Sequence, residues 1–205
     1  MPLPDMPGVI APDGAAFDQD AALVGRCVAG DSEAFRPLVQ RHQRLAFSVA
    51  YRMLGSRADA EDACQQSFVD AYAALDRFKG DGRPNGFANW LLRILVNRCK
   101  DVLKSKKRTE TSLEPEMGET AVFSHRVRDP EVQLSDSHER RALERALQSL
   151  PTKYREVLIL KDVEELAYEE IRAILRLPIT TLKIRVVRAR AMMREALEKN
   201  EGMTP

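Results

Sequence analysis

The sequence predicts an all-α protein: two helical domains joined by a flexible acidic linker, the C-terminal domain being a helix-turn-helix. Three observations support this fold class. Apolar residues recur at spacings of three and four along most of the chain, and no stretch alternates apolar and polar residues as a strand would. One internal stretch lacks any such period. A short helix, a turn and a longer basic helix follow near the C-terminus.

The composition is that of a soluble protein with packed cores. Of the 205 residues, 44% are hydrophobic and 31% are charged. The net charge is only +1, so any affinity for nucleic acid must come from local clusters of cations. No apolar run approaches the roughly 18 to 20 residues that span a bilayer, and the N-terminus does not resemble a secretory signal. We therefore expect a cytoplasmic protein with no direct membrane insertion.

Cysteines and histidines give no sign of a metal, cofactor or catalytic site. Cys27, Cys64 and Cys99 are odd in number and too far apart for a zinc or redox pair. His42, His125 and His138 are scattered, and no phosphate-binding Gly-rich loop occurs. We expect reduced, buried thiols, no cofactor and no enzyme activity. A redox-responsive adaptor that uses one of the cysteines is an alternative.

The N-terminal domain begins after a tail, residues 1–18, that is rich in Pro and Gly and is expected to be disordered. Asp20 is expected to cap a short first helix, and Asp31 the next one. The second helix ends at Gly55. Ser56 then stands where the N-cap of a long third helix is expected.

The third helix carries the stretch "DAEDACQQSF", residues 59–68, whose acid and amide groups share one solvated face. Such a face would repel DNA and suits an Arg-rich protein partner. Ordinary helix solvation is the alternative. The candidate protein-binding residues are Asp59, Glu61, Asp62, Gln65 and Gln66.

A loop rich in Gly, "KGDGRPNG" at 79–86, precedes a fourth helix at 87–108. This helix combines the aromatic residues Phe87 and Trp90 with a basic end. Aromatic rings beside cations are typical of single-stranded DNA binding, because bases stack on rings while phosphates need cations. At this helical spacing, however, core packing is the favoured role of the two rings.

Residues 109–136 contain seven acidic and two basic residues and show no helical period. This stretch is longer than ordinary connections within a domain, so it is expected to be a linker. The expected domain organisation is a tail at 1–18, an N-terminal domain at 19–108, a linker at 109–136, a C-terminal domain at 137–198 and a tail at 199–205.

In the final helix, Leu182, Val186 and Ala189 form a stripe expected to be buried. Ile184 lies about 200° around the helix from Leu182 and should point outward. Lys183, Arg185 and Arg188 flank it. Cations bind phosphates regardless of sequence, whereas an exposed isoleucine can contact thymine methyl groups in the major groove.

Four blocks in this order resemble the extracytoplasmic-function (group IV) bacterial sigma factors. They are "DAEDACQQSF", then "F..WLLRI..N...D..K" in 87–104, "LP..YREVLIL" in 150–160 and "YEEI..IL.LP..T.K.R..RAR" in 168–190. The resemblance covers about residues 20–197.

The resemblance implies an alternative sigma factor that binds the clamp helices and the flap of core RNA polymerase. Such a factor recognises promoter DNA and opens it. The resemblance also implies an anti-sigma factor as a partner. The 59–66 face would bind the clamp helices. The residues implied at the minus-ten element are Lys79, Arg83, Asn85, Asn89, Arg93, Asn97 and Lys100, the last four outward on the fourth helix. Those implied at the minus-thirty-five element are Thr181, Lys183, Ile184, Arg185 and Arg188.

Several residues depart from the family pattern, among them Thr180 in place of Gly and Leu182 in place of Val. Arg172 replaces a small residue, Arg176 stands where the turn usually has Gly, and Ile184 replaces a small polar residue. A duplex-DNA regulator that uses only the helix-turn-helix is a second alternative. It would bind duplex DNA strongly without polymerase.

Overall fold

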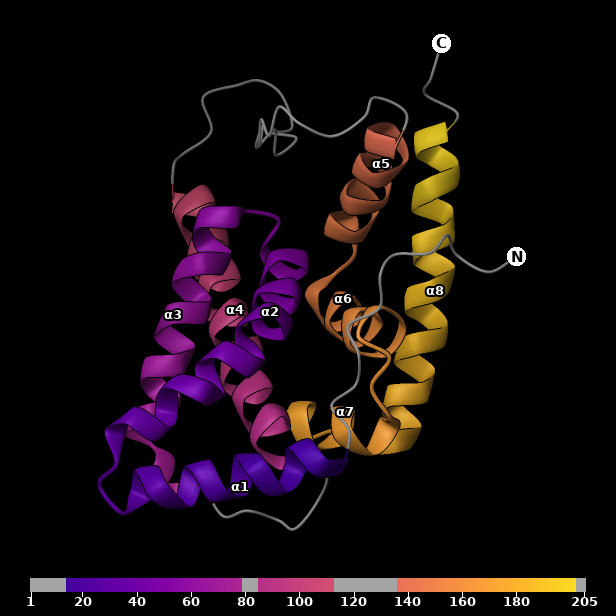
Figure 1. The fold of residues 1–205 in the computed structure, drawn as a ribbon. Coiled ribbons are helices and arrows are strands. Elements are labelled where there is room, and N and C mark those ends of the chain that lie inside the picture. Colours follow the sequence, from indigo (N-terminus) through magenta and orange to yellow (C-terminus); the bar gives the residue numbers. More distant parts are fainter. Residues whose placement is uncertain (1–13, 79–84, 113–135, 202–205) are drawn as a thin grey trace.

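The N-terminal segment of the chain is a bundle of four α-helices (Figure 1). The computed structural model describes residues 14–78, 85–112 and 136–201, and these residues form helices and turns without strands. The all-α prediction is therefore confirmed. The elements of this segment are α1 Gly14–Val28, the 3-10 turn η1 Ser32–Ala34, α2 Phe35–Leu54, α3 Arg57–Ala73, the 3-10 turn η2 Leu75–Arg77 and α4 Gly86–Ser112.

The C-terminal segment contains the predicted helix-turn-helix. Helix α8 is the long yellow helix of Figure 1 and packs against α5 and α6, while α7 crosses near its start. The elements are α5 Asp136–Ser149, α6 Thr152–Leu158, the π-helical turn η3 Ile159–Val163, α7 Tyr168–Leu175 and α8 Ile179–Glu201. Among the described helices, none is long and apolar enough to cross a membrane.

Gly55 and Ser56 make the sharp turn between α2 and α3. Gly55 has a φ of 69°, and its N–H donates to the carbonyl of Tyr51. A Cβ at Gly55 would lie 2.9 Å from the Gln148 side chain of α5. Ser56 is the N-cap of α3, since its side chain accepts from the N–H of Asp59 at 3.4 Å. The predicted role of Ser56 as an N-cap is thus confirmed. Gly is favoured at position 55 because φ is positive there and because a Cβ would lie too close to Gln148.

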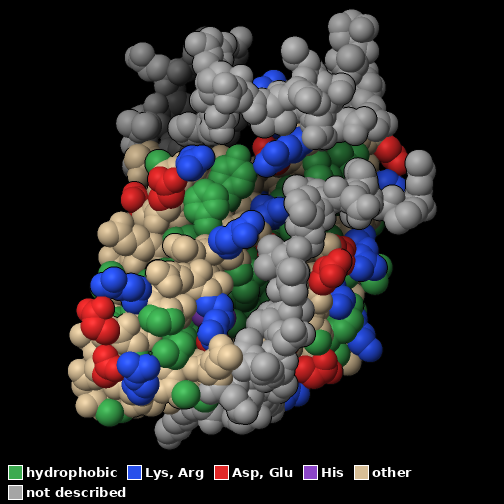
Figure 2. All heavy atoms as spheres, viewed as in Figure 1, with side chains coloured by type: hydrophobic (Ala, Val, Ile, Leu, Met, Phe, Trp, Pro, Cys, Tyr) green, Lys and Arg blue, Asp and Glu red, His purple; other side chains and the backbone are tan. Residues whose placement is uncertain are grey.

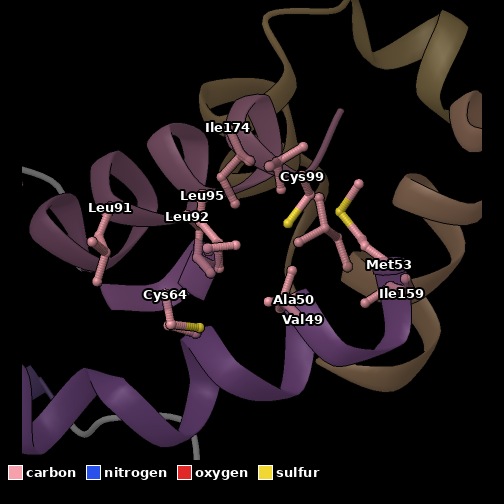
Figure 3. Close-up of a cluster of buried hydrophobic side chains, with 14 of the residues drawn as sticks. Val49, Ala50, Met53, Cys64, Leu91, Leu92, Leu95, Cys99, Ile159 and Ile174 are labelled. Atoms are coloured by element: carbon pink, nitrogen blue, oxygen red, sulfur yellow. The ribbon is translucent and has the colours of Figure 1, made fainter. Parts of the chain in front are cut away.

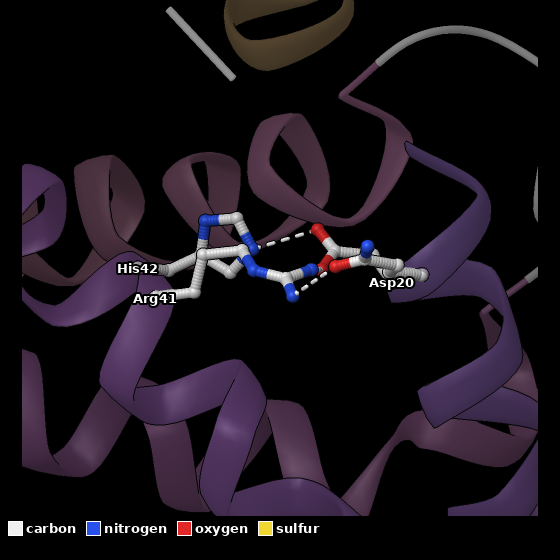
Figure 4. Close-up of polar contacts among 4 residues, drawn as sticks. Asp20, Arg41 and His42 are labelled. Carbon is white, nitrogen blue, oxygen red and sulfur yellow. Dashed lines mark hydrogen bonds and ion pairs between the residues drawn. The ribbon is translucent and has the colours of Figure 1, made fainter. Parts of the chain in front are cut away.

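Asp20 is not the N-cap that the sequence suggested. It lies within α1 and is buried, and its carboxylate bonds to Arg41 and to His42 Nε2, the latter at 2.7 Å (Figure 4). The carboxylate therefore joins α1 to α2 instead of capping its own backbone. A buried carboxylate needs such partners. The His42 ring also faces Phe87, with 5.4 Å between the ring centroids.

The two segments share one apolar core. Ile159 and Ile174 of the C-terminal segment lie in the same cluster as Met53, Leu95 and Cys99 of the N-terminal segment (Figure 3). Helix α4 packs against α7 along this contact. Apolar burial of this kind is the main force that holds helices together, so the structure shows the two segments closed on each other.

Arg155 of α6 adds a polar tie across the same contact. Its side chain is buried, and its guanidinium donates to the carbonyls of Met53 and Leu150 and to both carbonyl oxygens of Gln148. Burial lowers the pKa of Arg155 to about 10. Removing these acceptors would leave a buried cation without partners, which is costly.

Arg176 ends α7 in the left-handed conformation, with a φ of 54°. This is the position where the family pattern places Gly, which tolerates positive φ without a Cβ clash. At the start of the same helix, Glu170 accepts a hydrogen bond from the N–H of Ala167 at 2.8 Å. Arg172, the other departure in this helix, is exposed.

Candidate nucleic-acid and protein interfaces

Helix α8 presents the predicted DNA-reading face to solvent. Leu182, Val186 and Ala189 are buried, whereas Ile184 is 55% exposed. Lys183 and Arg188 are exposed beside it, and Thr181 is half-buried. The outward direction of Ile184, inferred from helix geometry alone, is therefore confirmed.

Val187 belongs to this face but was missed in the sequence analysis. It is 67% exposed and lies three residues after Ile184, so the two side chains project from the same side of α8. The available signal was its angle of about 100° to the buried Val186. Arg188 lies beside Tyr154 and lowers its pKa by hydrogen bonding.

Two arginines of α8 are held in ion pairs. Arg190 binds Asp162 of η3 through two hydrogen bonds of 2.8 and 2.6 Å, and this bonding raises its pKa. Arg185, a predicted DNA contact, is half-buried and lies 3.4 Å from a carboxylate oxygen of Glu156. Arg185 thus differs from Lys183 and Arg188, which face solvent.

The predicted strand-opening residues of α4 are only partly accessible. Lys79 and Arg83 lie outside the described residues. Asn97 is exposed, but Asn89 is buried, which corrects the expectation that it points outward. The expectation placed one apolar face of this helix against the core, whereas α4 packs against α2, α3 and α7.

The other members of this set touch the C-terminal segment. Asn85 donates to Glu170 Oε1 at 2.9 Å. Lys100 Nζ lies 2.9 Å from Glu156 Oε2. Arg93 is half-buried, and its pKa is lowered by burial and by the positive charge of Arg176. The closed arrangement therefore brings α4 and the C-terminal helices together at these residues.

Helix α3 presents the predicted protein-binding face. Asp62 and Gln65 are exposed and Asp59 is half-buried in an ion pair with Lys106. Glu61 pairs with Arg57 along the helix, and Gln66 donates to Asp70 at 2.9 Å. All five predicted residues lie on one helix, and four of them are exposed.

A groove between α2 and α3 continues this face and was not foreseen. It has a volume of about 650 Å³ and is lined by both apolar and charged residues of the two helices. Val69 and Tyr72, which line it, are 54% and 47% exposed. Exposed apolar residues beside an acidic helix are typical of protein-docking surfaces.

Charge on the surface is mixed. On the face seen in Figure 2, Lys and Arg side chains alternate with Asp and Glu and do not form one extended basic patch. This agrees with the net charge of +1. Any nucleic-acid binding would therefore have to rest on local sites, and the start of α8 is the predicted one.

The three cysteines are free thiols. Cys64 and Cys99 are buried, and burial raises the pKa of each to about 12. A thiol at such a pKa is unreactive at neutral pH. Cys27 is half-buried, and its pKa is also raised, first by burial. These environments favour the structural role over the redox alternative.

Comparison with known proteins identifies the two segments. Residues 38–109 match the family model Sigma-70 region 2, and residues 140–193 match Sigma-70, region 4. The ECF RNA polymerase sigma-E factor of Escherichia coli (strain K12) is 36% identical over 176 residues, which are 83% of this chain and 90% of the relative. The RNA polymerase sigma-H factor of Pseudomonas aeruginosa is 31% identical, over 88% of this chain and 95% of the relative.

Solved structures share the fold. CnrH, in complex with the cytosolic domain of CnrY, has a TM-score of 0.65 at 29% identity, covering 89% of this chain and 99% of CnrH. The sigma factor RpoE of Bartonella quintana, solved with the anti-sigma factor NepR, has a TM-score of 0.60 at 24% identity, covering 80% and 96%.

Region 2 and region 4 in this order define a sigma-70-type transcription initiation factor. The chain belongs to the extracytoplasmic-function sigma factors, as the sequence blocks suggested.

Proposed function

We propose that this chain binds core RNA polymerase, recognises the minus-thirty-five and minus-ten promoter elements and opens the DNA for transcription initiation. The observation that carries the proposal is the face of α8, where Lys183, Ile184 and Arg188 are exposed over a buried stripe in a matched region 4. Side chains near the start of such a helix can reach base edges, while the cations hold phosphates.

In this proposal the α3 face with Asp59, Glu61, Asp62, Gln65 and Gln66 binds the polymerase clamp helices. The groove between α2 and α3 would receive apolar side chains of that partner. Its exposed Val69 and Tyr72 support this role, because buried apolar contacts supply most of the affinity of protein interfaces. The first helices of the C-terminal segment would bind the flap.

Strand opening is assigned to Asn85, Asn89, Arg93, Asn97 and Lys100, together with Lys79 and Arg83, which lie outside the described residues. The exposed Asn97 and the half-buried Arg93 and Lys100 support this assignment. Upstream recognition is assigned to Thr181, Lys183, Ile184, Arg185 and Arg188. The domains would span residues 19–108 and 137–198, with a linker at 109–136.

An anti-sigma factor is the proposed regulator. The complex of CnrH with the cytosolic domain of CnrY supports a protein partner for a chain of this fold. The protein would act in the cytoplasm and would carry no catalytic residue of its own, since the polymerase performs the chemistry.

Transcription in vitro tests the proposal. Core polymerase is incubated with genomic promoter fragments, with and without this chain, and the transcripts are mapped. We expect new start sites that depend on the chain. Core polymerase giving the same transcripts in both reactions, together with tight duplex binding by the chain alone, would favour the duplex-DNA regulator instead.

A further inference from the structure

One buried carboxylate contacts both proposed DNA-binding surfaces. Glu156 of α6 is 4% exposed. Its Oε2 lies 2.9 Å from Lys100 Nζ of α4, and its Oε1 lies 3.4 Å from Arg185 Nη1 of α8. Lys100 belongs to the strand-opening set and Arg185 to the upstream set. A single acid therefore neutralises one cation from each set.

The contact with Lys100 depends on charge. The 2.9 Å distance is that of an ion pair, but among the described residues no group meets hydrogen-bond geometry with Glu156 Oε2. An amide in the same place would keep the shape of the side chain and lose most of this attraction. Because Glu156 is almost completely buried, its charge is tolerated only while the cations stay beside it.

Other side chains repeat the pattern at the same contact. Glu164 of the C-terminal segment accepts from Ser48 and lies 3.7 Å from Arg52, both on α2. Glu170 accepts from Asn85. In each case the C-terminal segment supplies the acid, and the N-terminal segment supplies the donor. Phosphates of promoter DNA would need the same kind of donor.

We propose that the ion pair of Glu156 with Lys100 forms a latch that helps to hold the two segments closed and keeps Lys100 from DNA until the segments separate. Opening then frees Lys100, whereas Arg185 lies in the same C-terminal segment as Glu156 and keeps its contact with that acid. The latch is a property of the chain itself and needs no regulatory partner. The functional meaning of the released Lys100 rests on the proposed function, whereas closure by Glu156 does not.

Small-angle X-ray scattering of the full chain tests the latch. The variants are Glu156→Gln and, as a matched control, Asp162→Asn. The control also changes one acid to an amide, but its partner Arg190 lies in the same C-terminal segment. We expect Glu156→Gln to shift the closed-to-open equilibrium by roughly 10- to 100-fold toward the open form and to increase the radius of gyration. Asp162→Asn should match the wild type.

A second variant removes the cation of the pair instead of the acid. Lys100→Gln leaves Glu156 buried without its nearer cation, so it should also open the chain, with circular dichroism confirming that the helices remain. Radii of gyration equal to the wild type for both variants would overturn the latch. This readout is independent of transcription: an open Glu156→Gln chain that gives no promoter-dependent transcripts would contradict the proposed function and leave the latch standing.

Discussion

At the scale of single residues, exposure separates structural from functional side chains on the same helix. Leu182 and Val186 are buried on α8, while Ile184 and Val187 face solvent. Exposed aliphatic residues on a helix that is proposed to read DNA are suited to contacts with thymine methyl groups. Specificity is therefore expected to reside in Ile184 and affinity in the cations around it.

Replacing Ile184 by Ser should alter the base preference at the upstream element. A hydroxyl loses the methyl contacts and can hydrogen-bond to several bases, so discrimination at one base pair should change by about 1 kcal/mol. Ile184→Val is the control, since it keeps an apolar surface. Selection of bound sequences from a randomised upstream element, in the presence of polymerase, measures the preference. Identical preferences for the Ser variant and the wild type would reduce Ile184 to a surface aliphatic.

Gly55 allows a sharper test of backbone geometry. Gly55→Ala places a Cβ at a φ of 69° and 2.9 Å from Gln148, so the free energy of unfolding should fall by about 1 kcal/mol or more. Gly25→Ala is the matched control, because Gly25 lies in α1 with nothing within 4 Å of its added Cβ. That variant should be neutral or slightly more stable. Urea unfolding of both variants measures the free energy of unfolding. An equal loss of that free energy in both variants would contradict the role assigned to Gly55.

At the scale of elements, the periodicity of a helix predicts which way a side chain points but not which other element packs against it. The outward direction of Ile184 followed from its angle to Leu182, since both lie in one helix. The burial of Asn89 and the pairing of Lys100 with Glu156 could not be predicted in this way. They depend on which distant helix packs against α4. Asp20 shows the same limit, because its partners Arg41 and His42 lie on another helix.

The face of α3 carries a prediction at this scale. Asp62→Arg should weaken binding to core polymerase by about tenfold, because a cation would meet the basic partner that the acidic face is proposed to bind. Glu169→Arg makes the same change on the exposed surface of α7 and should leave core affinity unchanged. Fluorescence anisotropy of labelled chain titrated with core polymerase gives both affinities. Unchanged affinity of the Asp62 variant would exclude it from the docking face.

At the scale of the whole molecule, closure buries charge as well as apolar surface. The side chains of Glu156, Glu164 and Arg155 are all buried at the contact between the segments. Each contacts a group of the N-terminal segment: Lys100, Arg52 and the Met53 carbonyl, respectively. Ion pairs of this kind add little net stability compared with apolar packing but make the arrangement specific. The closed form is therefore expected to respond to changes in charge more than a purely apolar contact would.

Glu164 makes this dependence measurable through pH. Burial raises the pKa of Glu164 above the ordinary 4.5, and the hydrogen bond from Ser48 and the positive charge of Arg52 offset this only in part. The folded, closed chain therefore binds a proton more tightly than the unfolded chain does. The resulting stability is fully present below about pH 4.5 and is lost as the pH rises through the raised pKa.

We expect Glu164→Gln to remove this part of the pH dependence. The free energy of unfolding of the wild type, measured by urea titration, should fall relative to that of the variant as the pH rises above 4.5, and the difference should become constant above the raised pKa. The amide keeps the acceptor for Ser48, so the contact itself is retained. Parallel curves for the two chains across this range would show that Glu164 is charged equally in both states, and the burial of its carboxylate would then have no role in setting the stability of the closed form.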